Sequence, residues 1–285
     1  IKTNDNQIGR KLKVVGEAAA GSKSNKKVTA GEAIRVFTGA QLPKGADSII
    51  IQEDVIIEGS FIKLGNKIEK TNFIRKKGSD FSIEDKLPKS TLLTPQILSL
   101  IAAMNYKAIP VYAKPTVAVI SSGNELSEPG KKLKVNQIVA SNNFGLSAML
   151  ESFGASPEIF PVVPDDINLI CETLNEALSF DLIVTVGGAS VGKYDLIRAA
   201  GKKLGLKVLF NSVAMRPGKP LMGGQIKETP LIALPGNPVS ALVCCEVVVQ
   251  QLIRKMIGLK ATFEEKCFAV LQRPLSKNGI REHYM

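Results

Sequence analysis

Polar and charged side chains follow the predicted strands of the second half of the chain, at the points where those strands end. These side chains are Ser122, Asn124 and Glu125; Asp165 and Asp166; Ser190 and Asp195; Arg216 and Lys219; and Asn237 and Ser240. Because open α/β sheets bind ligands outside the carboxyl ends of their strands, we expect these groups to converge on one site. Carboxylates there could hold Mg²⁺ beside substrate phosphates, and the two cations could bind an oxyanion. Each acid taken singly is more typical of a helix cap or a solvated residue.

A glycine-rich stretch, Asp181–Asp195, is central to this arrangement. The apolar, β-branched run Leu182–Val186 predicts a buried strand, which stops at Gly187 and Gly188. A further glycine, Gly192, follows, and the residues after the stretch return to helical spacing. Glycines let the backbone approach a ligand, and the start of a helix favours an anion. A plain strand-to-helix turn needs the same glycines, so this loop alone favours neither interpretation.

Two proline-containing turns could also take part. Residues 216–220, Arg-Pro-Gly-Lys-Pro, hold two cations in a stiff turn, so that a guanidinium fork and an ammonium group face an oxyanion. A purely structural turn is the alternative. Residues 235–238, Pro-Gly-Asn-Pro, place an N-cap asparagine before a proline at the first helical position, which predicts the start of a helix.

Strands and helices alternate through residues 115–260. The expected strands are Thr116–Ser121, Glu158–Val163, Leu182–Val186, Lys207–Phe210 and Pro230–Leu234. The expected helices are Asn142–Phe153, one that follows Pro164-Asp165-Asp166 and runs to about Ser179, one that ends at about Leu204, and Val239–Met256. Alternation of this kind predicts a doubly wound, mostly parallel α/β domain.

The rest of the chain predicts other domains. Residues 1–80 are expected to form a β-rich domain with strands at Lys11–Val15, Ala33–Phe37, Ser48–Val55 and Phe61–Leu64. Residues 81–114 are expected to form a linking helical segment, because Thr94 and Pro95 are typical of a helix start. Residues 261–285 are expected to begin a truncated C-terminal β-domain, with a strand at Lys266–Leu271.

The amino-acid composition argues against several classes of protein. The 285 residues are 45% hydrophobic, which is enough for two or three domains with real cores. No apolar run approaches the ~18–20 residues of a membrane span, and the four cysteines contain no CxxC pair, which favours a reducing cytoplasm. The single histidine, His283, argues against a His-bearing triad or a multi-histidine metal site. A net charge of +11 with only 5% aromatic residues favours an anionic small molecule, or a merely lysine-rich proteome, over nucleic-acid binding.

Ordered motifs cover nearly the whole chain. They read FTGAQLPKGADSIIIQED, IRKKGSDF, SSGNEL around Gly123, SNN at Ser141–Asn143, GGASVGKYD, AMRPGKP and LPGNPVSA. In this order they resemble the molybdopterin molybdotransferase family, which comprises the MoeA-type proteins and the E domain of gephyrin. The resemblance implies a β-rich domain, a linking domain, a C-terminal β-domain, and an α/β domain related to the molybdopterin-adenylyltransferases.

The resemblance also implies an activity, the last step of molybdenum cofactor synthesis. Adenylylated molybdopterin is bound, its phosphoanhydride is hydrolysed with Mg²⁺ and AMP is released, and molybdate is inserted into the dithiolene as substrate. By the same resemblance the catalytic acids are Glu125, Asp165, Asp195 and Asp80, of which Glu125 and Asp195 are also metal ligands. The implied substrate-binding residues are Thr38, Gly123, Asn142, Gly187, Gly188, Ser190, Gly192, Arg216, Lys219, Pro235, Asn237, Pro238 and Ser240. Thr38 and Asp80 match positions that reach the cleft from the partner subunit, which implies a homodimer with shared active sites; no nucleic-acid or membrane partner is expected.

The chain departs from the family pattern at several positions. Asn124 replaces the aspartate of the usual TGDEL, Ala140 stands where the family often has an aspartate, and a basic residue near Ser212 is missing. Loss of two carboxylates would weaken metal or water handling unless neighbouring acids compensate. The family's MDGYA motif would fall just before Ile1, and most of the C-terminal domain would follow Met285. We therefore expect a fragment, or the ordered core of a longer protein.

Two other functions stay open. The first is adenylylation of molybdopterin, although that related family usually carries GGTG-type loops, whereas this chain has GGASVG and the additional RPGKP and LPGNPVS motifs. The second is a cofactor-binding or scaffold homologue that has lost catalysis, to which Asn124 and Ala140 lend weight.

Overall fold

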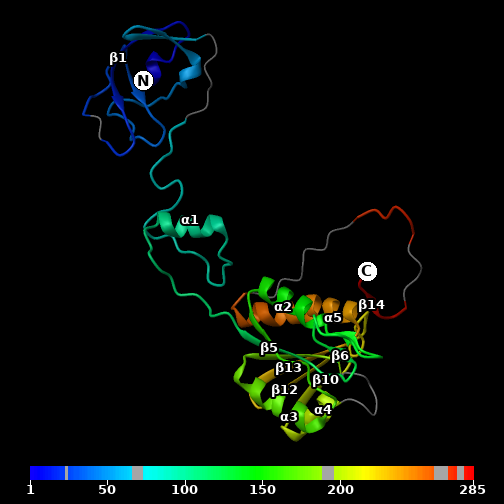
Figure 1. The fold of residues 1–285 in the computed structure, drawn as a ribbon. Coiled ribbons are helices and arrows are strands. Elements are labelled where there is room, and N and C mark those ends of the chain that lie inside the picture. The colour runs from blue at the N-terminus through cyan, green and yellow to red at the C-terminus, as the bar shows by residue number, and fades with distance from the viewer. Residues whose placement is uncertain (23–24, 66–72, 188–195, 260–268, 275–278) are drawn as a thin grey trace. The chain divides into compact units, whose positions relative to one another are not determined.

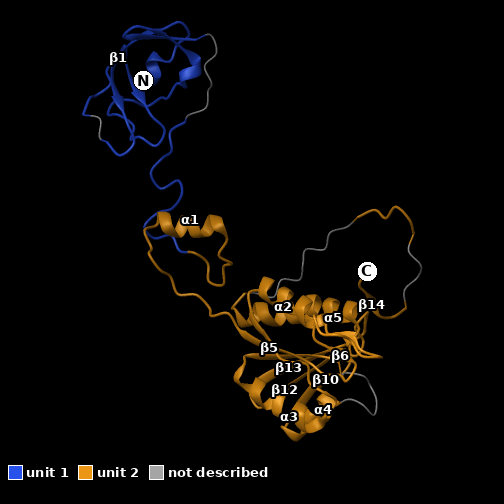
Figure 2. Ribbon diagram, viewed as in Figure 1, with its two compact units in different colours: residues 1–86 blue, residues 87–285 orange. Residues whose placement is uncertain are grey.

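The computed structural model describes residues 1–285 except 23–24, 66–72, 188–195, 260–268 and 275–278. The chain divides into two compact units, Ile1–Lys86 and Leu87–Met285, which are shown in different colours in Figure 2. In the described residues, no helix is both long enough and apolar enough to cross a membrane.

The first unit is built on a four-stranded sheet. Its strands, in spatial order, are β2 (Glu32–Val36), β1 (Lys11–Ala18), β4 (Phe61–Leu64) and β3 (Val55–Glu58). Strands β1 and β2 are parallel, and the other two pairs are antiparallel. Leu12 and Leu64 are fully buried beneath the sheet with Ala33 and the N-terminal Ile1, so that one small apolar cluster holds the strands together. Successive residues of a strand project to opposite faces, so Ala33 of β2 joins this cluster while the adjacent Ile34 joins a second one with Ala18 and Val28.

The predicted strand Ser48–Val55 was wrong. Residues Gln52–Asp54 form a short 3-10 turn, and strand β3 begins only at Val55. The turn at Gly59, where Glu58 pairs with Phe61, sets the register of the β3–β4 hairpin, and in this register Val55 pairs with Leu64, the last residue of β4, so the residues before Val55 have no partner on β4. The apolar residues before the 3-10 turn pack without pairing, as Ile50 does against the core of the unit.

The second unit contains a six-stranded sheet (Figure 1). Its strands, in spatial order, are β10 (Lys207–Phe210), β12 (Met222–Ile226), β13 (Thr229–Leu234), β9 (Leu182–Val186), β5 (Thr116–Ser121) and β8 (Ser156–Ile159). The four strands from β13 to β8 are parallel, whereas β12 is antiparallel to both of its neighbours. The predicted class, a β-rich domain followed by a mostly parallel α/β domain, is confirmed.

Strand β12 was missed because it contains adjacent glycines, which are uncommon in strands. Packing explains them. A Cβ on Gly223 would lie 2.3 Å from the Cε1 atom of Phe210, and a Cβ on Gly224 would lie 2.7 Å from the carbonyl oxygen of Lys207. Neighbouring β10 therefore comes too close for any side chain at these positions.

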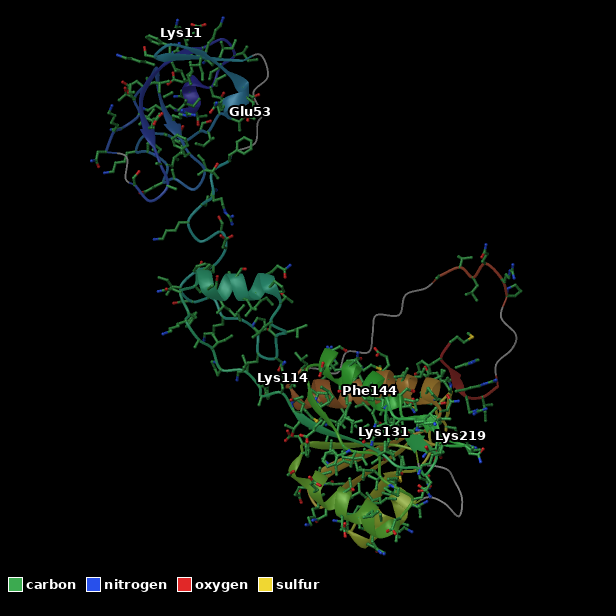
Figure 3. All side chains as sticks on the ribbon, in the orientation of Figure 1. Lys11, Glu53, Lys114, Lys131, Phe144 and Lys219 are labelled. Carbon is green, nitrogen blue, oxygen red and sulfur yellow. The ribbon has the colours of Figure 1, made fainter. Side chains whose placement is uncertain are left out.

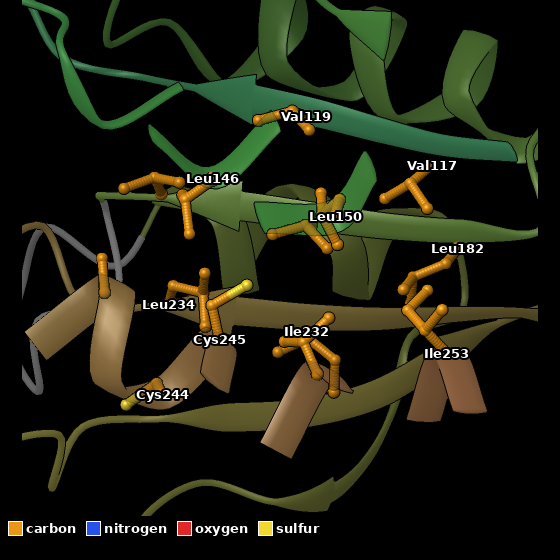
Figure 4. Packing of buried hydrophobic residues seen from close by; sticks show 14 of the residues in the cluster. Val117, Val119, Leu146, Leu150, Leu182, Ile232, Leu234, Cys244, Cys245 and Ile253 are labelled. Atoms are coloured by element: carbon orange, nitrogen blue, oxygen red, sulfur yellow. The ribbon is translucent and has the colours of Figure 1, made fainter. Parts of the chain in front are cut away.

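Helices cover both faces of the six-stranded sheet. One face carries α2 (Asn142–Ser152), α5 (Pro238–Cys244) and α6 (Gln250–Met256), and the other carries α3 (Ile167–Glu176) and α4 (Leu196–Lys203). Successive side chains of β5 point to opposite faces of the sheet. Val117 and Val119 pack in the first core, shown in Figure 4, and Ala118 and Ile120 pack in the second. The predicted helix Val239–Met256 is interrupted by a π-helical turn, Cys245–Val249.

Shorter elements complete the unit. They are α1 (Pro95–Ala103), β6 (Leu126–Ser127), β7 (Ile138–Val139), a 3-10 turn at Ala177–Ser179, β11 (Met215–Arg216) and β14 (Glu282–His283). Thr94 caps α1 by accepting a hydrogen bond from the Ile97 amide at 3.4 Å, as its sequence predicted. The predicted strand Lys266–Leu271 lies partly outside the described residues.

Helix α3 allows a matched test of the second core. Leu174 is fully buried, whereas Leu169 on the same helix is 42% exposed. We expect Leu174→Ala to lower the free energy of unfolding of this unit by about 2–5 kcal/mol, because it removes buried methyl groups and leaves a cavity. Leu169→Ala should cost under about 1 kcal/mol. Urea unfolding followed by circular dichroism measures both, and equal losses would contradict the assigned packing.

Candidate functional site

Loops after three parallel strands meet at the carboxyl edge of the sheet. Gly187 follows β9, and a Cβ there would lie 3.0 Å from the carbonyl oxygen of Ser122, which follows β5. Gly236 follows β13, and a Cβ on it would lie 3.5 Å from the Cα of Gly187. The side-chain Nδ2 of Asn142, at the start of α2, donates a hydrogen bond of 2.9 Å to the carbonyl oxygen of Gly236. The structure therefore brings Asn142, Gly187 and the Gly123 loop together, as expected for one site.

The loop after β5 folds back on itself. Gly123 is buried, and its amide donates to the carbonyl oxygen of Val163 at 3.1 Å. A Cβ at this position would lie only 2.4 Å from Oε2 of Glu125, so the Glu125 carboxylate lies directly over the glycine. A side chain at position 123 would displace this carboxylate, so the glycine allows the acid to lie at the sheet edge.

Two neighbouring loops are joined by a reciprocal pair of hydrogen bonds, which we call the Asn124–Asp165 clasp. The side-chain oxygen of Asn124 accepts from the Asp165 amide at 3.1 Å, and Oδ2 of Asp165 accepts from the Asn124 amide at 3.2 Å. Asp166 has a different role, because its Oδ1 accepts from the amides of Asn168 and Leu169 and caps α3. Asp165 thus belongs to the sheet-edge site, and Asp166 is a helix cap.

The clasp predicts a specific response to substitution at position 124. Asn124→Leu removes the acceptor of the Asp165 amide, and we expect amide hydrogen exchange at Asp165 to accelerate by about tenfold, which corresponds to one net hydrogen bond. Asn124→Asp keeps an acceptor oxygen, so protection should stay close to that of the unchanged protein. Exchange followed by NMR distinguishes the two, and equal protection in both variants would contradict the clasp.

The turn that carries Arg216 and Lys219 packs against helix α5 through Gly218. Both cations are exposed, while Gly218 between them is buried. Gly218 has a φ of +114°, and a Cβ there would lie 2.5 Å from Sγ of Cys244 on α5. The Val213 amide donates to the carbonyl oxygen of Lys219 at 3.0 Å and closes the turn. Figure 3 shows the labelled Lys219 at the margin of the α/β fold, where its ammonium group is accessible.

The loop after β13 starts α5 as predicted. Oδ1 of Asn237 accepts hydrogen bonds from the Ser240 amide at 3.2 Å and from its hydroxyl at 3.4 Å. Asn237 and Pro238 are exposed, whereas Pro235 is buried. Asn237 and Ser240 are therefore engaged with one another as a helix cap, and Pro235 holds the loop against the core.

A pocket of about 270 Å³ opens beside the clasp. Its lining is Gly123, Asn124, Leu126, Ser127, Glu128, Lys131, Gln137, Val162 and Pro164. An ion pair of 2.6 Å between Lys131 and Glu128 lies in this lining. The pocket connects the loop after β5 with the loop before α3, so that a ligand there would contact Asn124 directly.

Six of the predicted site residues lie either outside the described residues or in the first unit. Gly188, Ser190, Gly192 and Asp195 lie outside the described residues. Thr38 and Asp80 belong to the first unit. Thr38 is exposed in a turn closed by the Ala40 amide and the carbonyl oxygen of Phe37, and Asp80 pairs with Arg75.

Buried polar and sulfur groups beneath the edge were not predicted. The Ser121 hydroxyl donates to Oδ1 of Asn143, and both residues are buried, so that β5 and α2 are joined under the site. Burial raises the pKa of the Cys244 thiol to about 11 and that of Cys245 to about 12. Both thiols are therefore protonated at neutral pH, which argues against a thiolate nucleophile here. The SNN motif was the signal for Asn143, whereas nothing local marked Cys244.

The donor groups at the edge fit Mg²⁺ bound together with a substrate. Mg²⁺ takes oxygen ligands, commonly one or two carboxylates with substrate phosphates. Among the described residues, no group of three or more His, Cys, Asp or Glu side chains is placed to hold a metal by itself. Glu125 presents its carboxylate over Gly123. A carboxylate in this position could share a metal with substrate phosphates.

Comparison with protein families matches both parts of the chain. Residues 2–105 match the family described as the MoeA N-terminal region (domain I and II), and residues 118–255 match the probable molybdopterin binding domain. The second match contains the sheet-edge loops described above.

Curated relatives and solved structures agree with these matches. The chain is 34% identical to a molybdopterin molybdenumtransferase of a Nostoc species, over 96% of this chain and 64% of the relative. It is 35% identical to that of Haemophilus influenzae, over 91% of this chain and 65% of the relative. The chain therefore spans slightly less than two thirds of these relatives. A crystal structure of the molybdopterin biosynthesis MoeA protein of Pyrococcus horikoshii is similar with a TM-score of 0.70 and 31% identity, over 91% of this chain and 65% of that one.

Proposed function

The chain belongs to the molybdopterin molybdenumtransferase family, and on that premise we propose that it inserts molybdenum into adenylylated molybdopterin in the final step of molybdenum cofactor biosynthesis. In this reaction water adds to the phosphoanhydride, one bridging P–O bond breaks, and AMP leaves. Molybdate then binds the two dithiolene sulfurs, whose two thiol protons pass to one molybdate oxygen, and this oxygen leaves as water without a change of oxidation state.

One observation carries the proposal. The loops after β5, β9 and β13 contact one another at a single edge, where Glu125 lies over Gly123 and Asp165 joins Asn124. Acids and exposed cations on one fold suit a ligand that carries phosphates, because the cations bind anionic oxygens and the acids orient water. The net charge of +11 also favours anionic ligands such as phosphate and molybdate.

Each group of residues has a proposed role. Arg216 and Lys219 bind anionic oxygens, and their turn is held by the contact between Gly218 and Cys244. Glu125 and Asp165 orient the attacking water and accept its proton. Gly123, Asn142, Gly187, Gly188, Ser190, Gly192, Pro235, Asn237, Pro238 and Ser240 shape the substrate cleft. Mg²⁺ would be held by Glu125 and Asp195 with the substrate phosphates, and would neutralise charge on the phosphoanhydride.

Assembly and domain structure belong to the proposal as well. We infer a homodimer in which Thr38 and Asp80 complete the partner subunit's site, because both side chains are exposed on the first unit. We also infer four domains, at residues 1–80, 81–114, 115–260 and 261–285. Mixing Asp80→Ala protein with Glu125→Gln protein should restore turnover through hybrid dimers that contain one intact site. Analytical ultracentrifugation that shows only monomers at turnover concentrations would contradict the shared site.

Release of AMP tests the proposed reaction. The protein is incubated with adenylylated molybdopterin, with and without Mg²⁺, and AMP is measured by chromatography. We expect AMP only with Mg²⁺, and we expect Asp195→Asn to slow its release. Tight binding without any AMP release would support a scaffold function, and full turnover by Asp195→Asn would show that this acid is misassigned.

A further inference from the structure

The C-terminal segment returns to the α/β fold and extends the cation turn. Strand β14, labelled in Figure 1, pairs in parallel with β11 by its backbone register. The Glu282 amide donates to the carbonyl oxygen of Ala214 at 2.9 Å, and the Tyr284 amide donates to that of Arg216 at 2.8 Å. Strand β14, which follows β11 by more than sixty residues, thus forms hydrogen bonds with the backbone of the strand that contains Arg216.

The register places His283 opposite Arg216 and Glu282 opposite Met215. Paired residues of parallel strands project to the same side, and successive residues project to opposite sides. Tyr284 packs against the core that contains Met215. Burial is the larger cause, and the nearby charge of Glu282 the smaller one, that raises the pKa of the Tyr284 phenol. The exposed Glu282 and the half-buried Tyr284 therefore lie on one side of β14, and the half-buried His283 lies on the other side with Arg216.

We propose that His283 is a further anion-binding residue, which binds a phosphate oxygen of the ligand beside Arg216. An imidazole N–H donates a hydrogen bond to such an oxygen, and its position next to the Arg216 and Lys219 cations gives the ligand donors from two strands. The carboxylate of Glu282 projects to the other side, so it does not oppose an anion there. The exposed Arg281 precedes the strand and adds positive charge to the same segment. The inference rests on the proposed function for the identity of the ligand, a phosphate-bearing nucleotide.

Calorimetric titration of the protein with AMP tests the inference. We expect His283→Ala to weaken AMP binding by about three- to tenfold, which corresponds to one net hydrogen bond. His283→Lys should retain most of the affinity, because an ammonium group can replace the donor. Glu282→Gln is the matched control, since it changes the neighbouring residue on the opposite side of β14 and should leave affinity within about twofold.

Thermal unfolding of each variant separates binding from folding. If His283→Ala unfolds early, His283→Gln provides the conservative comparison, because it keeps a donor of similar length. Unchanged AMP affinity in folded His283→Ala, together with a loss in Arg216→Ala, would overturn the inference and leave the proposed function standing. Failure of the unsubstituted protein to bind AMP would overturn both. Equal losses in His283→Ala and Glu282→Gln would show that β14 acts only through the backbone, which also overturns the assignment of His283.

Discussion

Replacement of Arg216 by alanine is expected to lower kcat/KM for adenylylated molybdopterin by about a hundredfold. The guanidinium lies exposed on the turn whose other cation is Lys219, and the proposed ligand carries phosphates. Charge-assisted hydrogen bonds of this kind contribute about 1.5–3 kcal/mol, and each 1.36 kcal/mol of transition-state stabilisation is a factor of ten. Arg216→Lys keeps the charge but loses the planar fork, so we expect a loss of about tenfold.

Lys207→Ala is the control for a general loss of positive charge. Lys207 is exposed at the first residue of β10, which runs parallel to β13 because each is antiparallel to β12 between them. It therefore lies at the opposite edge of the sheet from the site. We expect Lys207→Ala to change kcat/KM by under about twofold at moderate salt, because exposed charges that far away are screened. A similar small effect for Arg216→Ala would mean that the turn does not bind the substrate.

Gly218→Ala is expected to have the second large effect, on both stability and turnover. The residue has a φ of +114°, and the added Cβ would lie 2.5 Å from Sγ of Cys244 and 3.3 Å from Cε of Met215. Backbone strain costs about 1–2 kcal/mol, and the clash with a fully packed sulfur adds to it. We expect the free energy of unfolding of the second unit to fall by about 2–4 kcal/mol. Turnover should fall more than tenfold, because the turn must move.

Two comparisons isolate the clash. Gly205→Ala introduces the same strain at a φ of +85° with no atom within 4 Å of the new Cβ, so it should cost only about 1 kcal/mol. Cys244→Ala removes the opposing sulfur, so the double variant Gly218→Ala/Cys244→Ala should be more stable than the sum of the two single losses predicts. Additive losses, or equal losses at Gly218 and Gly205, would show that Cys244 does not hold the turn.

The structural features that the sequence predicted correctly are determined by residues close together in the chain. The apolar run of β9, the proline after Asn237 and the Thr94 cap are each determined by neighbours a few residues away, and the structure contains all of these features. The same reasoning led to the α/β class, since alternating strands and helices leave few other arrangements. Strand β12 was missed because its glycines are explained only by the close approach of Phe210.

The site itself depends on contacts that no local pattern reveals. Asn124 and Asp165 are 41 residues apart, and their mutual hydrogen bonds arise only when β5 and β8 deliver the two loops to one edge. Strand β14 pairs with β11 across a still longer stretch of chain. Ordered motifs identified the participating segments through a family resemblance, and the predicted helix cap at Pro164-Asp165-Asp166 is confirmed for Asp166 by its contacts with the α3 amides, but the pairing of Asp165 with Asn124 was not predicted.

Formation of the finished cofactor tests the central claim most directly. The protein is incubated with adenylylated molybdopterin, Mg²⁺ and molybdate, and the mixture is split between an AMP assay and reconstitution of a cofactor-free molybdenum enzyme. We expect active cofactor and AMP in equal amounts, and we expect Arg216→Ala to slow the formation of both. AMP release without active cofactor would contradict molybdenum insertion, and substrate binding with neither product would contradict the proposed reaction as a whole.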